Sequence, residues 1–271
     1  MGGAVYAVIG GKGGVGKTTT AVNLGVVLGR TGRDAVVVDA DLAMTNVAAR
    51  LGLDAEPGLH RVLAEEAPVR DAVVTGPGGL AVLPGDRELG AYGEADPERL
   101  PRVLDLLAVA YDVVLVDTGP GVQHEGLVAM GAADGAVVVA TADEVAIHDA
   151  NRTIAVADRV DCPVVGGVLT RADGRSTPTV ADALDPELLG VIPEYDVPAG
   201  GPTAAVAPDS DAAAAYRSMA ESLPLADAAT EGDAAGDEGA EAAASAQDAD
   251  EDADRGANAG ERAADGDRVT T

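Results

Sequence analysis

The amino-acid sequence predicts an α/β fold, in which a doubly wound, mostly parallel sheet of about seven to eight strands has helices on both faces. Three observations lead to this prediction. Short apolar runs recur along the chain with helix-length stretches between them, which is the order expected of βαβ units. The runs are continuous stretches of Val, Ile and Leu, as expected of strands covered on both faces. The first run leads into a glycine-rich loop and then a helical pattern, the context of a phosphate-binding loop.

The predicted strands share this apolar character and span residues 5–9, 35–39, 80–83, 113–117, 136–140, 164–169 and 188–192. Helices are predicted at residues 17–30, 97–110, 126–132, 145–160 and 211–222. Two of these helices have a clear start signal, because Asp96 and Ser210 each place a capping side chain directly before the first turn.

The composition of the chain changes near Pro224. Residues 226–271 contain 14 Asp or Glu against 3 Arg, and Val269 is their one large aliphatic residue. Such a segment buries too little apolar surface to offset the entropy of ordering it. We therefore expect a P-loop domain over residues 1–225 and a disordered acidic tail over residues 226–271.

The net charge of −28 is the strongest signal in the composition. Nucleic acid and anionic lipid carry negative phosphates, so this surface disfavours both as direct partners. The charge suits a cytoplasm near molar salt, where the Debye length falls to ~3 Å. We interpret the source as a halophile, and an archaeon; a merely acidic mesophilic protein is the alternative.

Cysteine and histidine usage indicates no metal cluster. The single cysteine, Cys162, excludes an intrachain disulfide and any Cys-based cluster within one chain, and it is expected to be buried. His60, His124 and His148 are dispersed, so solvated or hydrogen-bonded roles are expected for them. The sequence shows no signal peptide, and no apolar run approaches the ~20 residues of a membrane span. We expect a soluble, cytoplasmic protein.

Residues 10–19 read Gly-Gly-Lys-Gly-Gly-Val-Gly-Lys-Thr-Thr, which satisfies the P-loop pattern from Gly11 to Thr18. Backbone N–H groups in such a loop surround phosphate oxygens, and the following helix N-terminus adds partial positive charge. We expect Lys17 to neutralise the β- and γ-phosphates and the Thr18 hydroxyl to bind Mg²⁺. The residues predicted to bind nucleotide here are Gly11, Lys12, Gly13, Gly14, Val15, Gly16, Lys17, Thr18 and Thr19, the last by bonding the α-phosphate.

Lys12 and Lys17 are the only lysines in the chain, and every other cationic residue is Arg. With Lys12 in it, the loop resembles the deviant Walker A loop of the MinD/ParA ATPases. In that family the extra lysine reaches across a dimer interface to the partner's nucleotide. The resemblance implies ATP and Mg²⁺ as cofactors, an ATP-dependent homodimer, and catalysis by Lys12, Lys17 and Asp41.

Residues 39–46 place Asp39 and Asp41 at the C-terminal end of a predicted strand, the edge at which open parallel sheets bind ligands. The segment resembles the switch I of the same family, although the family often has Gly where Ala43 stands. The resemblance implies that Asp41 positions the attacking water and that Asp39 supports the Mg²⁺ shell. A plain helix-capping role is the alternative for both residues.

Residues 113–121 resemble a Walker B strand that leads into switch II. By this resemblance Asp117 accepts hydrogen bonds from Mg²⁺-bound water, and the backbone of Gly121 senses the γ-phosphate. The predicted metal-site residues are therefore Thr18, Asp39 and Asp117.

Later segments also resemble the family, so that the likeness covers about residues 4–222. Residues 168–171 resemble the segment that contacts adenine, which makes Thr170 and Arg171 candidate base contacts; a surface turn is the alternative for Thr170. Residues 190–194 resemble the following base-side loop and add Pro193. Residues 141–152 resemble the MinD helix that meets partners at the dimer edge.

The leading hypothesis is a MinD-type switch ATPase that dimerises with ATP and positions cellular structures through an unidentified protein partner. A ParA-type DNA-partitioning ATPase would need basic residues on its surface, but residues 1–225 hold 15 basic against 32 acidic residues. An iron–sulfur carrier would need bridging cysteines, and Lys12 counts against a metabolic P-loop enzyme. Bacterial MinD-type proteins end in a basic amphipathic membrane helix, which residues 226–271 do not resemble. We expect no direct binding to nucleic acid or membrane.

Overall fold

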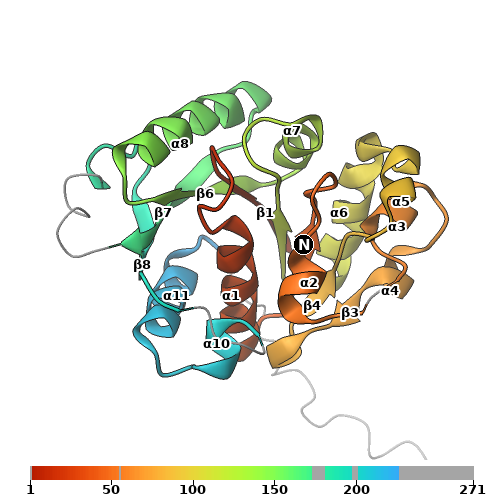
Figure 1. Ribbon diagram of the computed structural model, residues 1–271, viewed down its shortest axis with the longest axis horizontal. Coiled ribbons are helices and arrows are strands. Elements are labelled where there is room, and N and C mark those ends of the chain that lie inside the picture. Colours follow the sequence, from red (N-terminus) through yellow and green to blue (C-terminus); the bar gives the residue numbers. More distant parts are fainter. Residues whose placement is uncertain (1, 55, 173–180, 197–200, 226–271) are drawn as a thin grey trace, which may run out of the picture. The chain divides into compact units, whose positions relative to one another are not determined.

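The structure is a computed structural model that describes residues 2–54, 56–172, 181–196 and 201–225. Residues 226–271, predicted to form an acidic tail, lie outside the described residues. The strands are β1 (Ala4–Ile9), β2 (Ala35–Asp39), β3 (Val74–Thr75), β4 (Ala81–Leu83), β5 (Val113–Asp117), β6 (Gly135–Thr141), β7 (Val164–Ala172) and β8 (Leu188–Pro193). They form one eight-stranded sheet in the order β3-β4-β2-β5-β1-β6-β7-β8 (Figure 1).

All neighbouring strands in this sheet are parallel except β3 and β4. The described α-helices are α1 (Lys17–Arg30), α2 (Val47–Leu51), α3 (Leu59–Leu63), α4 (Val69–Ala72), α5 (Leu89–Glu94), α6 (Leu100–Ala110), α7 (His124–Gly131), α8 (Glu144–Ala157), α10 (Thr203–Val206) and α11 (Asp211–Ser222). Three 3-10 turns lie at η1 (Pro77–Gly79), η2 (Pro97–Arg99) and η3 (Asp158–Val160). The predicted fold class is confirmed.

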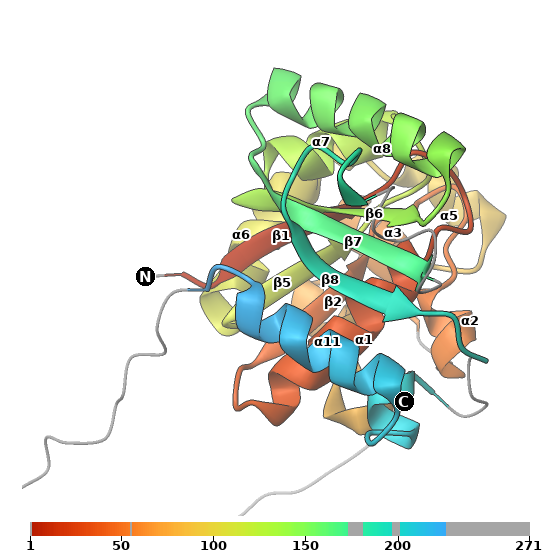
Figure 2. The ribbon, with the colours of Figure 1, turned by 90° about the vertical axis from the view of Figure 1, so that its left-hand side faces the viewer.

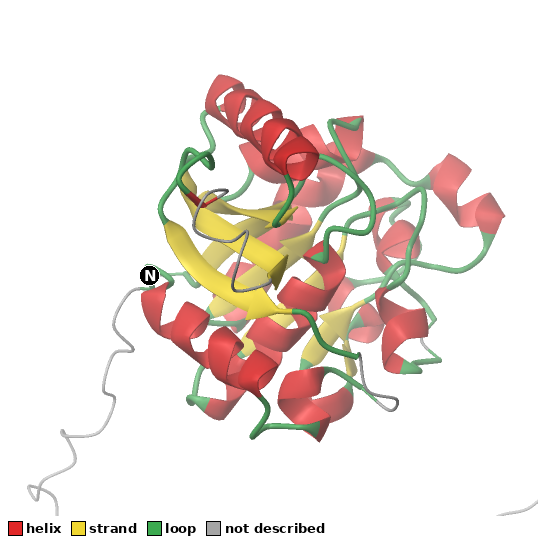
Figure 3. Cartoon of the chain, turned by 60° about the vertical axis from the view of Figure 1, so that its left-hand side comes forward, coloured by secondary structure: helices red, strands yellow, loops and turns green. Residues whose placement is uncertain are grey.

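Helices cover both faces of the sheet because successive strand residues point to opposite sides. In β1, Tyr6 and Val8 pack in a core with residues of α1 and α11. Ala7 and Ile9, one position along, pack with residues of α7 and α8 on the other face. The opposite half of that second face is covered by α3 and α6. Figure 2 shows α1 and α11 on one side of the strands and α8 on the other, and Figure 3 shows helices on both sides of the strands.

The sequence prediction missed the shortest elements. Strand β3 has two residues, and helices α2 to α5 and α10 have four to six. Elements this short do not show the hydrophobic periodicity of a helix or of a strand in the sequence. Of the longer helices, the one predicted at residues 126–132 begins earlier, at His124, and those predicted at 97–110 and 145–160 each include a 3-10 turn. Both predicted caps are confirmed: Asp96 accepts the Glu98 N–H at 3.1 Å, and Ser210 accepts the Ala213 N–H at 3.2 Å.

Two further observations concern single features. Cys162 is buried as expected, with 1% of its surface exposed. Within the described ranges, no helix combines the length and apolar character needed to cross a bilayer.

Candidate functional site

The topology of the sheet brings three strand ends together. Strand β5 lies between β1 and β2, so that Asp117 is paired in register with Val8 on one side and with Asp39 on the other. The loop of residues 10–16 leaves β1 one residue beyond this point. The two carboxylates predicted from separate segments therefore lie side by side, next to the P-loop, at the C-terminal edge of the sheet.

The P-loop is shaped by its glycines. Gly16 precedes α1 with φ of 103°, a conformation that side chains disfavour, and it turns the chain so that Lys17 opens the helix. Gly11 is needed for a different reason: a Cβ there would lie 2.6 Å from the carbonyl oxygen of Asp149 in α8. Gly13 and Gly14 have open space around them, which leaves room on this side for a ligand.

The end of β7 fixes the P-loop from beside it. The Thr170 hydroxyl donates a hydrogen bond to the Val15 carbonyl at 2.6 Å, and the Arg171 guanidinium donates to the Gly14 carbonyl at 3.0 Å. A small cavity of about 90 Å³ adjoins these contacts; it is lined by Val15, Gly16, Thr19, Thr170, Arg171, Ile192, Pro193, Tyr195 and Tyr216. The predicted base-side residues thus lie together beside the loop, while the Thr170 hydroxyl is engaged by backbone. Their contact with a base stays a prediction.

Lys17 is buried among carboxylates, with 7% of its surface exposed. Burial lowers the pKa of Lys17, and the negative charges of Asp117 and Asp41 oppose this shift. Among the described residues, no carboxylate oxygen lies within 4.0 Å of its ammonium. A buried cation without a close ion pair is suited to receive an anionic ligand.

Asp39 and Asp117 hold buried oxygen atoms without hydrogen-bond partners. One carboxylate oxygen of Asp39 accepts the N–H groups of Asn46 and Val47 at 2.9 and 3.0 Å, which caps α2, while its Oδ1 has no partner. Both oxygens of Asp117 lack one. One oxygen of Asp39 therefore caps α2, as the capping alternative predicted. The other oxygen of Asp39 and both oxygens of Asp117 are free for a ligand.

The pKa values of these two carboxyls reflect their surroundings. Burial raises the pKa of Asp39 to about 6, against the two backbone hydrogen bonds. Burial and the neighbouring charge of Asp39 raise the pKa of Asp117 to about 8. Two neighbours, the Thr18 hydroxyl and the Lys17 charge, oppose this rise in the pKa of Asp117. The Thr18 hydroxyl lies beside Asp117 but outside hydrogen-bond geometry.

These orphaned oxygens fit a hydrated divalent cation. Carboxylates and hydroxyls are the ligands that Mg²⁺ prefers, and unpaired buried acceptors require some partner. Among the described residues, no three His, Cys, Asp or Glu side chains are arranged to bind a metal by themselves. A cation held by Thr18, Asp39 and Asp117 would therefore depend on water and phosphate oxygens for its remaining ligands, as Mg²⁺ commonly does.

Replacing Asp117 with Asn is expected to stabilise the ligand-free protein by about 1–2 kcal/mol at neutral pH. The pKa of this buried carboxyl is raised to about 8, so Asp117 must take up a proton on folding at neutral pH, and a neutral amide avoids that cost. The same change should reduce the rise in melting temperature caused by Mg²⁺ with ATP. Thermal unfolding with and without Mg-ATP checks both parts. A lower melting temperature for the ligand-free variant would show that the carboxylate makes a structural bond instead.

Asp41 lies on the adjoining loop with 6% of its surface exposed. Its Oδ1 accepts the Met44 N–H at 3.2 Å, which bends the predicted switch I segment back on itself. Burial raises the pKa of Asp41; the charge of Lys17 opposes this rise, and the charge of Glu125 adds to it. Asp41 is thus in the same electrostatic cluster as Lys17, and its charge also acts on Asp39 and Asp117.

Lys12 differs from Lys17 in its exposure. Its side chain is 42% exposed, and its ammonium lies 3.8 Å from Asp143 Oδ1, at the N-terminal end of α8. Asp143 is itself half exposed, accepts the Thr141 hydroxyl at 2.6 Å and caps α8 through Ala146. An exposed pair at this distance is weak, so Lys12 is free to reach a group outside its own chain.

Switch II touches the P-loop directly. The Gly121 N–H donates a hydrogen bond to the Gly10 carbonyl at 3.1 Å, and Gly121 adopts a φ of 72°. In this state its N–H is bonded to the loop backbone, so sensing a γ-phosphate would require an exchange of partners. The role predicted for Gly121 stays a prediction.

Sequence reasoning missed Glu125, which is buried in the first turn of α7 with Oε1 unpartnered. His60 was expected to be solvated or hydrogen-bonded; the structure shows it buried, with Nε2 2.9 Å from the carbonyl oxygen of Leu42, the residue directly after Asp41. Neither residue has a local signal. Most carboxylates are solvated surface groups, and the neighbouring sequence does not show which of them tertiary packing will bury.

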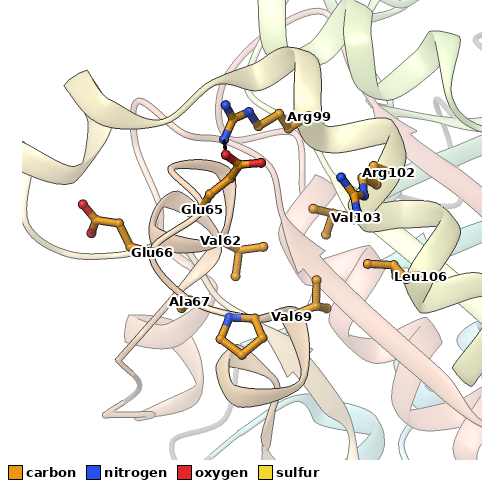
Figure 4. A pocket seen from close by; sticks show the side chains of 10 residues that line it. Val62, Glu65, Glu66, Ala67, Val69, Arg99, Arg102, Val103 and Leu106 are labelled. Carbon is orange, nitrogen blue, oxygen red and sulfur yellow. Dashed lines mark ion pairs between the residues drawn. The ribbon is translucent and has the colours of Figure 1, made fainter.

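A separate cavity of about 420 Å³ lies between the α3–α4 region and α6 (Figure 4). Its apolar lining includes Val62, Val69 and Leu106, and an ion pair of 2.9 Å joins Glu65 to Arg99 at its rim. None of the residues predicted to bind nucleotide lines this cavity. The nucleotide site is therefore assigned from the P-loop geometry.

Comparisons with known proteins agree with this geometry. Residues 3–162 match the sequence model of a family described as an AAA domain. An uncharacterized ATP-binding protein of Methanocaldococcus jannaschii is 34% identical over 227 residues, which are 80% of this chain and 86% of that protein. The crystal structure of the cell division ATPase MinD of Pyrococcus furiosus is 34% identical with a TM-score of 0.76, over 81% of this chain and 98% of that one. The septum site-determining protein MinD of Pyrococcus horikoshii, complexed with Mg-ADP, is 32% identical with a TM-score of 0.76, over 80% and 94% of the two chains.

Proposed function

Because this chain belongs to the MinD/ParA family of P-loop ATPases, we propose that it is a Mg²⁺-dependent switch ATPase of the MinD type. In this proposal ATP binding brings two copies together around their P-loops, the dimer engages a protein partner, and hydrolysis releases it. The observation that carries the proposal is the contrast between the two lysines: Lys17 is buried beside the carboxylates, whereas Lys12 is exposed at the lip of the same loop.

Exposed apolar side chains support the dimer. Met44, Val122 and Val145 are 71%, 50% and 64% exposed, and they follow β2, β5 and β6 respectively. All three therefore lie at the C-terminal edge of the sheet, around the P-loop. Exposed apolar groups that surround a charged site are suited to be covered by a second copy.

The residues of this chain divide the work of the reaction. Lys17 and the P-loop N–H groups bind and orient the phosphates, while Asp41 orients the attacking water at the γ-phosphate. Bound Mg²⁺ would neutralise charge on the β- and γ-phosphate oxygens, held by Thr18, Asp39 and Asp117. Lys12 from the partner copy adds a second ammonium to the charge that develops during transfer.

The proposed partner is a protein. Residues 1–225 hold 15 basic against 32 acidic residues, so their surface repels nucleic acid and anionic lipid at low salt. The P. furiosus and P. horikoshii relatives are named for cell division and septum siting, and a positioning role of that kind is proposed here.

Replacing Lys12 with Ala tests the proposal. We expect the variant to keep its affinity for Mg-ATP within a few fold, because Lys12 is exposed and lies outside the buried cluster of Lys17 and the carboxylates. Nucleotide-dependent dimerisation should be lost, and turnover measured by phosphate release should fall by ~10³-fold. A loss of this size is typical when an arginine finger supplied in trans is removed. Equilibrium dialysis, size-exclusion chromatography in molar KCl and a phosphate-release assay measure the three quantities.

Arg159→Ala is the matched control, since it also removes one exposed cation but from the turn that follows α8. It should bind, dimerise and turn over like the unmodified protein. Normal turnover in Lys12→Ala would remove the MinD-type assignment, and loss of activity in both variants would point to net charge alone.

A further inference from the structure

A buried histidine contacts the predicted switch I segment, residues 39–46. His60 lies on α3 with 2% of its surface exposed, and its Nε2 lies 2.9 Å from the carbonyl oxygen of Leu42. Leu42 directly follows Asp41, the residue proposed to orient the attacking water. His60 is therefore connected to that carboxylate through one residue of backbone.

The contacts of His60 determine which ring nitrogen carries the proton. Its Nδ1 accepts the backbone N–H of Asp86 at 3.0 Å, while its Nε2 faces a carbonyl oxygen that can only accept. Only the neutral tautomer with the proton on Nε2 satisfies both contacts. The ring is thus fixed at both nitrogens inside the protein.

Asp86 is fixed in turn, with 7% of its surface exposed. Its two carboxylate oxygens accept the N–H groups of Gly58 at 2.9 Å and Arg61 at 3.2 Å, which surround His60 in the chain. The Asp86 carbonyl also accepts the hydroxyl of Thr45, on the same switch I segment, at 3.3 Å. The His60–Asp86 pair consequently touches switch I at two positions.

The other end of switch I is fixed separately, by the Asp39 carboxylate on the N–H groups of Asn46 and Val47. Between these anchors only a short stretch projects outward, where Met44 is 71% exposed. His60 on α3, together with Asp86, therefore holds the backbone that follows Asp41.

We propose that His60 is a positioning residue for hydrolysis, which holds the switch I backbone so that Asp41 points toward the attacking water. This inference rests on the proposed ATPase function and adds a residue to it. It also makes α3, some twenty residues after Asp41 in the chain, part of the support of the site.

His60→Phe keeps much of the side-chain volume but loses both polar contacts, whereas His60→Gln keeps an N–H donor for the Leu42 carbonyl. We expect kcat for ATP hydrolysis to fall on the order of ten- to a hundred-fold in His60→Phe. KM should change by less than about threefold, because no phosphate contact is removed. Amide hydrogen exchange of residues 42–46 should accelerate in His60→Phe, and His60→Gln should restore both quantities toward those of the unmodified chain.

Leu63→Ala controls for destabilisation of α3. Leu63 is fully buried on the same helix and packs in the hydrophobic core, but it makes none of the polar contacts to switch I. We expect it to lower the melting temperature while leaving kcat and the exchange of residues 42–46 unchanged. An equal loss of kcat in Leu63→Ala and His60→Phe would overturn the proposal, as would unchanged exchange in His60→Phe.

The exchange measurement needs no turnover, so it separates this proposal from the proposed function. If the unmodified full chain did not hydrolyse ATP, the function would be wrong, and exchange of residues 42–46 in the nucleotide-free variants would still decide whether His60 holds the segment. If the chain hydrolysed ATP and His60→Phe matched it in kcat, the function would stand and the role of His60 would be rejected.

Discussion

Lys17→Ala is expected to weaken Mg-ATP binding by about 10²-fold or more. The ammonium is buried, has no close ion pair among the described residues, and is the cation nearest to Asp41 and Asp117. Without it, a triphosphate would enter a cluster of carboxylates with only Mg²⁺ to compensate its charge. Equilibrium dialysis with ATP, with Mg²⁺ and with excess chelator, measures the loss.

Arg30→Ala is the control for this variant, because it removes an exposed cation from the far end of the same helix, α1. Its affinity should match that of the unmodified chain. Thermal unfolding without ligand should show that Lys17→Ala remains folded, since the substitution removes a desolvated charge without opening an ion pair. Unchanged affinity in the folded Lys17→Ala variant would mean that the phosphates do not bind at this loop.

Asp41→Ala is expected to reduce turnover by ~10²-fold or more while Mg-ATP binding and the dimer persist. The carboxylate is proposed to orient water and not to bind the nucleotide. Its removal takes one negative charge away from the proposed phosphate-binding site, so binding should persist. Single-turnover phosphate release, dialysis and size-exclusion chromatography in molar KCl report the three quantities. An ATP-bound dimer that accumulates without hydrolysis is the expected outcome.

Asp41→Asn distinguishes the charge from the shape of the loop. Its amide oxygen can still accept the Met44 N–H that Asp41 Oδ1 accepts at 3.2 Å, so switch I should keep its conformation. Turnover as low as in Asp41→Ala would assign the effect to the missing negative charge. Failure of either variant to bind Mg-ATP would instead place Asp41 in the metal shell and reverse the roles proposed for Asp39 and Asp41.

Part of the site could be predicted from the sequence because its signals are local. The P-loop pattern from Gly11 to Thr18 requires certain residue types at fixed spacing, and the structure places it directly after β1 as expected. The carboxylates Asp39 and Asp117 end apolar runs, and parallel strands with buried ends meet at one edge of a sheet. Residues 226–271 lie outside the described residues, so the predicted tail is still a prediction.

The contacts that hold the site in place could not be predicted from the sequence. Thr170 was expected near a base, but its hydroxyl donates to the Val15 carbonyl, a partner 155 residues away in the chain. His60 was expected to be solvated or hydrogen-bonded, with no partner named, and Glu125 was given no role, since the type of a single polar residue does not show whether it will be buried. The edge strand β3 and the short helices α2 to α5 were missed for lack of length.

By itself the sequence determined the fold class, the phosphate-binding loop and the strand ends that carry carboxylates, because each depends on residue type and spacing within a few turns of the chain. Only the tertiary structure decided that Asp39 stands in register with Asp117, that Lys17 is buried while Lys12 is exposed, and that His60 binds the backbone beside Asp41. These are properties of strand order and of burial, which arise from packing between distant segments. A hydrogen bond across such a distance leaves no periodicity in the sequence, although it fixes the geometry of the site.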